Sequence, residues 1–226
     1  MTSRLDPDVN GGRFYVLSKL KQCNQYVVDS YVKGKFLTGK LLDYGCGQAP
    51  YRKLYQPQVK EYICADFKDN SLAQIEINRD GLLPLEKGSI DLVLSTQVLE
   101  HVPKVGAYLK EAKRILKANG LLVLSTHGFW MNHPDPKDYW RWTKEGLRKT
   151  IEDNGFAILE ILGVVGLAAS GLQLFQDGIQ GHLPGVLKKP LFYNIQLLQK
   201  IFDSGSLRQK DASVYVVVAK KQRRSK

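Results

Sequence analysis

An apolar run that ends in an acid and a Gly-x-Gly turn constrains this chain more than any other feature. The segment is 41–50, with the sequence LLDYGCGQAP. Glycine tolerates a positive φ and has no Cβ, so it lets the backbone of a strand-to-helix turn approach a nucleotide-like ligand closely. A tight turn between a strand and a helix uses the same residues without any ligand. The motif therefore predicts a buried parallel strand, and a nucleotide site beyond it is a hypothesis that needs a second signal.

That second signal is an acid at the end of the next apolar segment. Residues 61–65 precede Asp66, which lies 23 positions after Asp43. A carboxylate about twenty residues beyond a glycine turn suits the ribose hydroxyls of a ligand. A dinucleotide site places a small residue three positions after its second glycine, whereas this chain has Pro50 there. Asp43 would also repel a pyrophosphate but suits a cationic amino group, so the pattern disfavours a nicotinamide nucleotide.

The two acids and the glycine turn resemble the first motifs of the class I S-adenosylmethionine (SAM) methyltransferases. The resemblance covers roughly residues 38–162 and 211–220 and implies SAM as the cofactor. It implies that the turn faces the amino acid part of SAM, with Asp43 near the amino group, and that Asp66 binds the ribose diol. The cofactor residues implied in this way are Asp43, Gly45, Cys46, Gly47, Asp66, Asn78 on the adenine side (with Arg79 or Asp80 as alternatives), and Ser95 and Gln97 at the methionine end.

Strands and helices alternate along the chain, which favours a parallel sheet covered on both faces. We expect strands at about 40–44, 60–65, 73–77, 90–95, 121–126, 156–162 and 212–219, and helices at about 11–36, 105–118 and 143–153. Thr143 is the expected N-cap of the last of these helices, and Asn119-Gly120 the expected end of the one before it.

The order of these elements resembles the methyltransferase sheet. It implies a Rossmann-like α/β fold with a seven-stranded, mostly parallel sheet, an antiparallel last strand and helices on both faces. We expect a single domain over residues 1–226, with an N-terminal helical lead-in at 1–37, a helical insertion at 164–207 before the last strand, and a basic tail at 220–226.

The formal net charge of +11 is unevenly distributed, because residues 182–226 carry ten Lys or Arg against two Asp. Such a tail suits phosphates of nucleic acid or anionic lipid, or it serves solubility alone. No nucleic-acid-binding module accompanies it, which argues against nucleic acid. The three cysteines form no even disulfide framework, and residues 1–6 lack the apolar core of a signal peptide. A cytoplasmic protein is expected.

The predicted insertion contains an uncharged run at 161–176, which is shorter than the about 20 apolar residues of a membrane span. Residues 187–193 and 197–202 mix apolar and basic character, as interfacial helices do. Two interpretations remain open: a lid over the active site, or a peripheral contact with the inner face of the membrane.

The segment 97–103 (QVLEHVP) is also typical of the family. In some methyltransferases of quinone precursors, two acids and a histidine in this segment bind a divalent metal. Here Gln97 replaces the first acid, so we expect Glu100 and His101 to cap and pack the next helix, and we predict no metal.

The segment 127–143 (HGFWMNHPDPKDYWRWT) holds all three tryptophans of the chain. It is either a packed cover or an acceptor site, in which Tyr139, Trp140 and Trp142 contact sugar faces and Arg141 binds a phosphate or carboxylate. The pattern resembles methyltransferases of bacterial surface-glycan and lipid-linked saccharide biosynthesis.

Methylation of a hydroxyl gains from a general base with a pKa near the working pH, which favours histidine. His133 and His127 are the candidates, in that order, and Asp138 is expected to orient one of them. An acceptor carboxylate would need neither. We therefore expect SAM-dependent methyl transfer to a hydroxyl of a saccharide or another small hydroxylated metabolite.

Two alternatives stay open. One is a methyltransferase of a lipid or quinone-like small molecule, favoured if residues 164–207 form an apolar channel. The other is a non-catalytic scaffold subunit with a SAM-binding fold. The sequence carries no signal for the oligomeric state.

Overall fold

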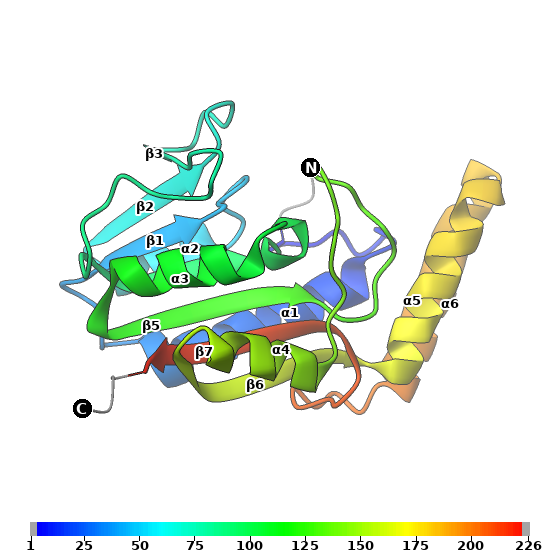
Figure 1. The fold of residues 1–226 in the computed structure, drawn as a ribbon. Helices are drawn as coiled ribbons and strands as arrows, with labels where there is room; N and C mark the ends of the chain where they lie inside the picture. The colour runs from blue at the N-terminus through cyan, green and yellow to red at the C-terminus, as the bar shows by residue number, and fades with distance from the viewer. Residues whose placement is uncertain (1–3, 223–226) are drawn as a thin grey trace.

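A computed structural model describes residues 4–222, which contain a seven-stranded sheet (Figure 1). The strands lie in the order β3-β2-β1-β4-β5-β7-β6. Their bounds are β1 Lys40–Tyr44, β2 Glu61–Asp66, β3 Ile75–Glu76, β4 Ile90–Thr96, β5 Leu116–His127, β6 Phe156–Gly166 and β7 Ala212–Lys221.

Strands β1 to β5 pair in parallel, whereas β7 runs antiparallel to both of its neighbours, β5 and β6. The predicted fold class is therefore confirmed, including the antiparallel last strand. Strand β1 is central and pairs with both β2 and β4, so the chain order reverses beside it. Ligands of open parallel sheets bind beyond the carboxyl ends of the strands at such a reversal.

Apolar side chains alternate between the two faces of the sheet, and each face is covered by helices. Leu41 belongs to an apolar cluster with residues of helices α1 (Phe14–Val27) and α2 (Arg52–Tyr55), whereas Leu42 belongs to a second cluster with residues of α3 (Val105–Ile115) and α4 (Lys144–Asp153). Figure 1 shows α3 and α4 in front of the sheet and α1 behind it. Helix α1 continues into a short π-helical segment, η1 (Val28–Val32).

The predicted caps had two outcomes. The hydroxyl of Thr143 accepts a hydrogen bond from the backbone N–H of Gly146 (3.1 Å), so the N-cap of α4 is confirmed. The expected end of α3 at Asn119-Gly120 was wrong, because the helix ends at Ile115 and strand β5 begins at Leu116. Pairing of β5 with β4 shifts register between Ile90 and Leu92, so residues 117–120 bulge out of the ladder instead of extending the helix.

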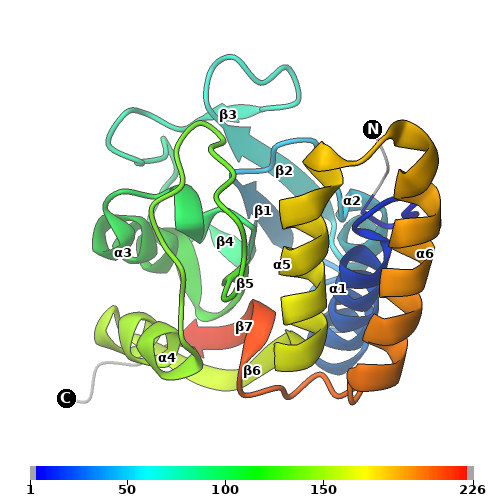
Figure 2. The same cartoon turned by 90° about the vertical axis from the view of Figure 1, so that its right-hand side faces the viewer.

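The segment between β6 and β7 forms two antiparallel helices, α5 (Leu167–Ile179) and α6 (Gly185–Phe202), joined through a short 3-10 turn, η4 (Gln180–His182). Figure 2 shows this pair beside α1, at one end of the sheet. Strand β6 runs to Gly166, four residues further than expected, and leads directly into α5. Within residues 4–222, no helix is both long enough and apolar enough to cross a membrane.

Candidate active site

The glycine turn after β1 adopts the conformation that its sequence predicts. Gly45 has φ +80° and Gly47 has φ +51°, both in the left-handed region. A Cβ on Gly45 would lie 2.8 Å from Cγ2 of Val98, whereas a Cβ on Gly47 would meet no described atom within 4 Å. Gly45 is therefore required by packing and by φ, and Gly47 leaves an open space beside the turn. Between them, Cys46 is buried.

Asp43 at the end of β1 is a buried carboxyl group with one free oxygen. Its Oδ2 accepts a hydrogen bond from the hydroxyl of Tyr62 (2.5 Å), and Oδ1 has no hydrogen-bond partner among residues 4–222. Burial raises the pKa of Asp43 to about 7, against the lowering effect of the Tyr62 hydrogen bond. An orphaned buried acceptor of this kind costs free energy unless a donor reaches it.

Asp66 at the end of β2 faces the same turn. Its Oδ2 accepts from the backbone N–H of Gly47 (2.7 Å) and from Nδ2 of Asn70 (2.7 Å), and Oδ1 accepts from the N–H of Phe67 (2.8 Å). These bonds hold the carboxylate at the mouth of the turn, while the residue remains partly exposed. The structure therefore brings the two predicted acids to the two sides of one glycine bend.

The other three predicted cofactor residues differ in placement. Oδ1 of Asn78 accepts from the N–H groups of Asp80 and Leu82, so this side chain builds an exposed turn. The hydroxyl of Ser95 is buried and lies 2.7 Å from the hydroxyl of Tyr108, on the α3 side of the sheet. Ser95 can thus contact a crevice ligand only through its backbone.

Gln97 lies at the crevice. It has φ +57°, and its backbone N–H and its Nε2 both donate to Ser125 (2.9 Å to the carbonyl, 3.0 Å to the hydroxyl). It lines a cavity of about 390 Å³ together with His127, Trp130, His133 and residues of the N-terminal segment: Arg4, Asp8, Gly11, Gly12, Arg13, Phe14, Val16, Leu17 and Leu20.

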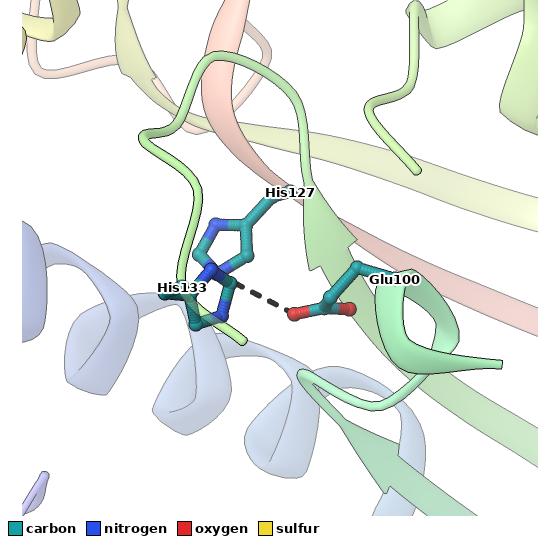
Figure 3. Close-up of side chains that lie close together, drawn as sticks. All are labelled: Glu100, His127 and His133. Atoms are coloured by element: carbon teal, nitrogen blue, oxygen red, sulfur yellow. Dashed lines mark ion pairs between the residues drawn. The ribbon is translucent and has the colours of Figure 1, made fainter. Parts of the chain in front are cut away.

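The two predicted base candidates, His127 and His133, meet at this cavity (Figure 3). Their rings are 4.8 Å apart, edge to face, and His127 stacks on Trp130 at the same distance. Nε2 of His127 lies 3.4 Å from Oε1 of Glu100. Nδ1 of His133 lies 3.2 Å from Oδ2 of Asp138, so Asp138 stands beside His133, as a residue that orients this imidazole must.

Burial controls the charge of these groups. It lowers the pKa of His127 well below the usual range and, more weakly, the pKa of the half-buried His133, which the Asp138 carboxylate partly restores. It raises the pKa of Glu100. Burial alone would also raise the pKa of Asp138, but the Arg141 guanidinium holds that pKa far below its usual value. At neutral pH the two imidazoles are therefore uncharged, and Asp138 is ionised.

The expected packing role of Glu100 and His101 differs from what the structure has. Both residues lie in the 3-10 segment η3 (Leu99–His101), and neither side chain caps α3. Glu100 is fully buried and accepts a hydrogen bond from Thr126 (2.9 Å). Nδ1 of His101 lies 2.7 Å from the carbonyl oxygen of Lys137 and so ties η3 to the loop between β5 and α4, residues 128–143, called here the aromatic loop.

Arg141 is engaged inside the aromatic loop. Its guanidinium pairs with both oxygens of Asp138 (2.6 and 2.5 Å) and donates to the carbonyls of Trp130 (3.0 Å) and Met131 (2.6 Å). Since these bonds occupy the planar fork, Arg141 positions the loop instead of offering a free anion site. The sequence suggested a substrate-binding role for Arg141, because a spacing of three residues predicts an ion pair in a helix but not in a loop. The pairing with Asp138 therefore could not be inferred.

The predicted aromatic wall does not line the cavity. Trp142 packs against the core on the α3 and α4 face, while Trp140 is exposed and its Nε1 donates to the carbonyl of Val102 (2.8 Å). Tyr139 is exposed and anchored by its backbone N–H to Glu100. Trp130, in the same loop, is the tryptophan that faces the cavity.

Sequence reasoning missed Trp130 and the N-terminal segment as cavity residues. For Trp130 the density of aromatic residues in 127–143 was the only signal. For the N-terminal segment there was none, because it reaches the site through tertiary contacts: Arg13 lies over the Trp130 ring at 5.2 Å, and the carbonyl of Gly12 accepts from Nε2 of Gln173 (3.0 Å) and Gln176 (2.5 Å) on α5.

Part of the chain is similar to known sequences. The family profile described as "Methyltransferase domain" matches residues 42–124. A probable S-adenosylmethionine-dependent methyltransferase of Mycobacterium tuberculosis is 30% identical over 95 residues, which make up 38% of this chain and 35% of that protein. A ubiquinone biosynthesis O-methyltransferase of Bradyrhizobium diazoefficiens is 30% identical over 123 residues, or 47% of this chain and 45% of that protein. The matched regions span less than half of these curated relatives.

Solved structures agree on the fold over most of the chain. The [4+2]-cyclase SpnF superposes with a TM-score of 0.62 at 14% identity, covering 94% of this chain and 85% of that chain. An S-adenosylmethionine-dependent methyltransferase from Mesorhizobium loti has a TM-score of 0.58 at 14% identity, covering 90% and 98%. At such identities the likeness shows the fold alone, and one fold hosts different reactions. Residues 42–124 thus match the methyltransferase domain family, in a chain that has the fold of the class I methyltransferases.

Proposed function

We propose that this protein is a SAM-dependent methyltransferase that methylates a hydroxyl group of a saccharide or another small hydroxylated metabolite. The observation that carries the proposal is the pairing of two acids across one glycine bend at the carboxyl edge of the sheet, within the segment that matches the methyltransferase family. Similarity to a probable S-adenosylmethionine-dependent methyltransferase supports SAM as the cofactor.

The residues at the bend fit such a cofactor. The free Oδ1 of buried Asp43 is an acceptor for a cationic amino group, and the open space beside Gly47 admits a ligand close to the backbone. Asp66 stands where ribose hydroxyls would be bound. When bound, SAM supplies an activated methyl group on a sulfonium. The task of the chain is to hold the acceptor oxygen close to that methyl group, because positioning supplies much of the rate of such a displacement.

His133 is the proposed general base. Its ring lies on the cavity, its imidazole is neutral at pH 7, and the carboxylate of Asp138 next to Nδ1 favours the tautomer that keeps Nε2 free. Nε2 can then accept the proton of an acceptor hydroxyl. His127 is the less suitable base because it is buried between Trp130 and Glu100.

The acceptor site is proposed to be the cavity between the N-terminal segment and the aromatic loop. Trp130 contributes apolar surface to the wall of this cavity, and Gln97 offers polar contacts for hydroxyls. A phenolic, quinone-like acceptor is the second candidate. It is favoured by the similarity over 123 residues to a ubiquinone biosynthesis O-methyltransferase.

A contact with the membrane surface is proposed for helices α5 and α6. Helix α6 leaves a row of large apolar side chains exposed, namely Val186, Leu187, Tyr193, Leu197, Ile201 and Phe202. Lys189 and Lys200 are exposed on the same helix and would complement an anionic lipid surface. The basic tail predicted to assist lies partly outside the described residues, since 223–226 are not among them.

Isothermal titration with S-adenosylhomocysteine tests the cofactor proposal and separates an enzyme from a scaffold. Binding in the micromolar range is expected for the wild type, and loss of binding for Asp66→Ala. A screen of glycans, sugar nucleotides, lipid-linked saccharides and phenolic quinone precursors with labelled SAM then identifies the acceptor. No uptake of S-adenosylhomocysteine by the folded protein would leave the scaffold alternative.

With the acceptor known, the base is tested by substitution. His133→Ala is expected to lower kcat by roughly 10²–10⁴-fold, the usual contribution of general base catalysis. His133→Ala and His127→Ala variants that both keep full turnover would refute the base assignment.

A further inference from the structure

Three potential metal ligands from separate segments converge at the edge of the cavity. Glu100 comes from η3, His127 from the end of β5, and His133 from the loop that follows. One ligand atom of each residue lies within 4.8 Å of the others (Figure 3). We infer that Glu100, His127 and His133 form a site for one divalent transition-metal ion.

An unpartnered buried oxygen supports this inference. Glu100 is 0% exposed and His127 is 5% exposed. Among the described residues, Oε1 of Glu100 has no hydrogen-bond partner. A buried carboxylate oxygen without a donor costs free energy, and a cation bound to it would remove that cost.

The distances suit an ion after a small movement. Ligand atoms of a tetrahedral ion with bonds of about 2.0–2.1 Å lie roughly 3.4 Å apart. Nε2 of His127 and Oε1 of Glu100 already have this separation, 3.4 Å. The ligand atoms of the set lie up to 4.8 Å apart, so His133 would have to approach by up to about 1.4 Å. It is only half-buried and belongs to a loop, so this approach requires no change in the sheet.

The ligand types define the class of ion. Two imidazoles and one carboxylate suit Zn²⁺ and neighbouring first-row ions better than Mg²⁺ or Ca²⁺, which prefer oxygen ligands. Asp138 would orient His133 from behind, as carboxylates do for metal-binding histidines. A three-ligand site of this type keeps a fourth position open, and here His127 and His133 both line the cavity.

The sequence pointed away from this set. The family pattern in segment 97–103 would use Gln97, Glu100 and His101, but His101 bonds the carbonyl of Lys137 instead. The two histidines that join Glu100 come from a segment 27 and 33 residues further along the chain. They meet Glu100 only because β5 ends beside η3.

The role of the ion rests on the proposed function, whereas its binding does not. In a methyltransferase, an acceptor hydroxyl at the open position would ionise more readily and release its proton to solvent. In that case the ion, and not a free imidazole, would activate the acceptor.

The test uses the full chain, stripped of metal with a chelator and dialysed. Titration with Co²⁺, followed by its visible absorption, and with Zn²⁺, followed by calorimetry, should give one ion per chain. X-ray absorption of the wild-type Zn²⁺ complex should show two imidazole ligands. His133→Gln and Glu100→Gln should each weaken binding by 100-fold or more. The matched control His182→Gln, in η4 outside the cluster, should leave binding unchanged.

Several outcomes would overturn the site. These are no bound ion in the folded wild type, an ion without imidazole ligands, or binding that His182→Gln abolishes and His133→Gln does not. Circular dichroism shows whether each variant folds, and the wild-type absorption measurement decides the question if the buried Glu100 variant does not. S-adenosylhomocysteine titration of the metal-free protein separates the two proposals: cofactor binding without any ion site refutes only the metal inference.

Discussion

Replacing Asp43 with asparagine should stabilise the protein by an amount that grows with pH. Asp43 is fully buried, and burial raises its pKa from 3.8 to about 7. At 1.36 kcal/mol per unit, this shift corresponds to about 4 kcal/mol by which folding disfavours the ionised carboxylate. A buried carboxyl group that lowers stability is not explained by stability itself. The presence of Asp43 is therefore consistent with a ligand that donates a hydrogen bond to the free Oδ1.

The sign follows from proton counts in the two states. Between pH 4 and 7 the unfolded chain has lost the Asp43 proton while the folded chain keeps it, so stability falls as pH rises and levels off above pH 7. An asparagine at this position cannot ionise and escapes this loss. The free energy of unfolding of Asp43→Asn minus that of the wild type should therefore increase by about 2–3 kcal/mol between pH 5 and pH 8.

Urea unfolding at pH 5, 6, 7 and 8, monitored by circular dichroism, measures this difference. Asp66→Asn is the matched control, because Asp66 ends the neighbouring strand but is partly exposed. A stability difference that is the same at pH 5 and pH 8 would refute the reasoning. In the Asp43→Asn variant, affinity for S-adenosylhomocysteine should fall at least tenfold if Oδ1 receives the amino group of the cofactor.

Three further predictions concern the turn, the base and the surface. Gly45→Ala should lower stability by at least about 1–2 kcal/mol in chemical unfolding, because the new Cβ meets Val98 at φ +80°; an unchanged midpoint would contradict the geometry. Burial lowers the pKa of His133 below its usual 6.5, so the decline of kcat/KM in acid should have its midpoint below pH 6.5; a midpoint above pH 7 would exclude His133 as the base. Ile201→Glu with Phe202→Glu should reduce co-sedimentation with anionic liposomes while leaving the thermal midpoint unchanged, and equal sedimentation of the variant and the wild type would reject the membrane surface.

Strands were predictable from the sequence because their apolar runs are local signals. Strand β1 was predicted at its observed bounds, and the Thr143 cap was found because a capping hydroxyl acts within three residues of itself. The end of α3 was not, since Gly120 looks like a helix terminator while the strand pairing with β4 overrides it. The register between two strands depends on segments that are far apart in the sequence, so a local stretch of residues does not reveal it.

In the candidate site, too, residues close together in the sequence could be predicted, whereas residues joined by tertiary contacts could not. The residues of the glycine bend could be predicted because one turn motif holds them together. The cavity could not be predicted, because it joins residues 4–20 to residues 97–133, which are far apart in the sequence. Arg141 shows the limit most directly: its type indicates an anion site, and only its contacts with Asp138 show that its charge is already used.

The bonds from Gln173 and Gln176 to the carbonyl of Gly12 have a consequence for access. They fasten the segment that encloses the cavity to α5, and α5 in turn packs along α6. An acceptor that displaces this segment must break both hydrogen bonds or move α5 with the segment. A partner that binds the exposed face of α6, such as a lipid bilayer, would then also affect how readily the cavity opens. Binding to a membrane and the turnover rate would in that case be coupled.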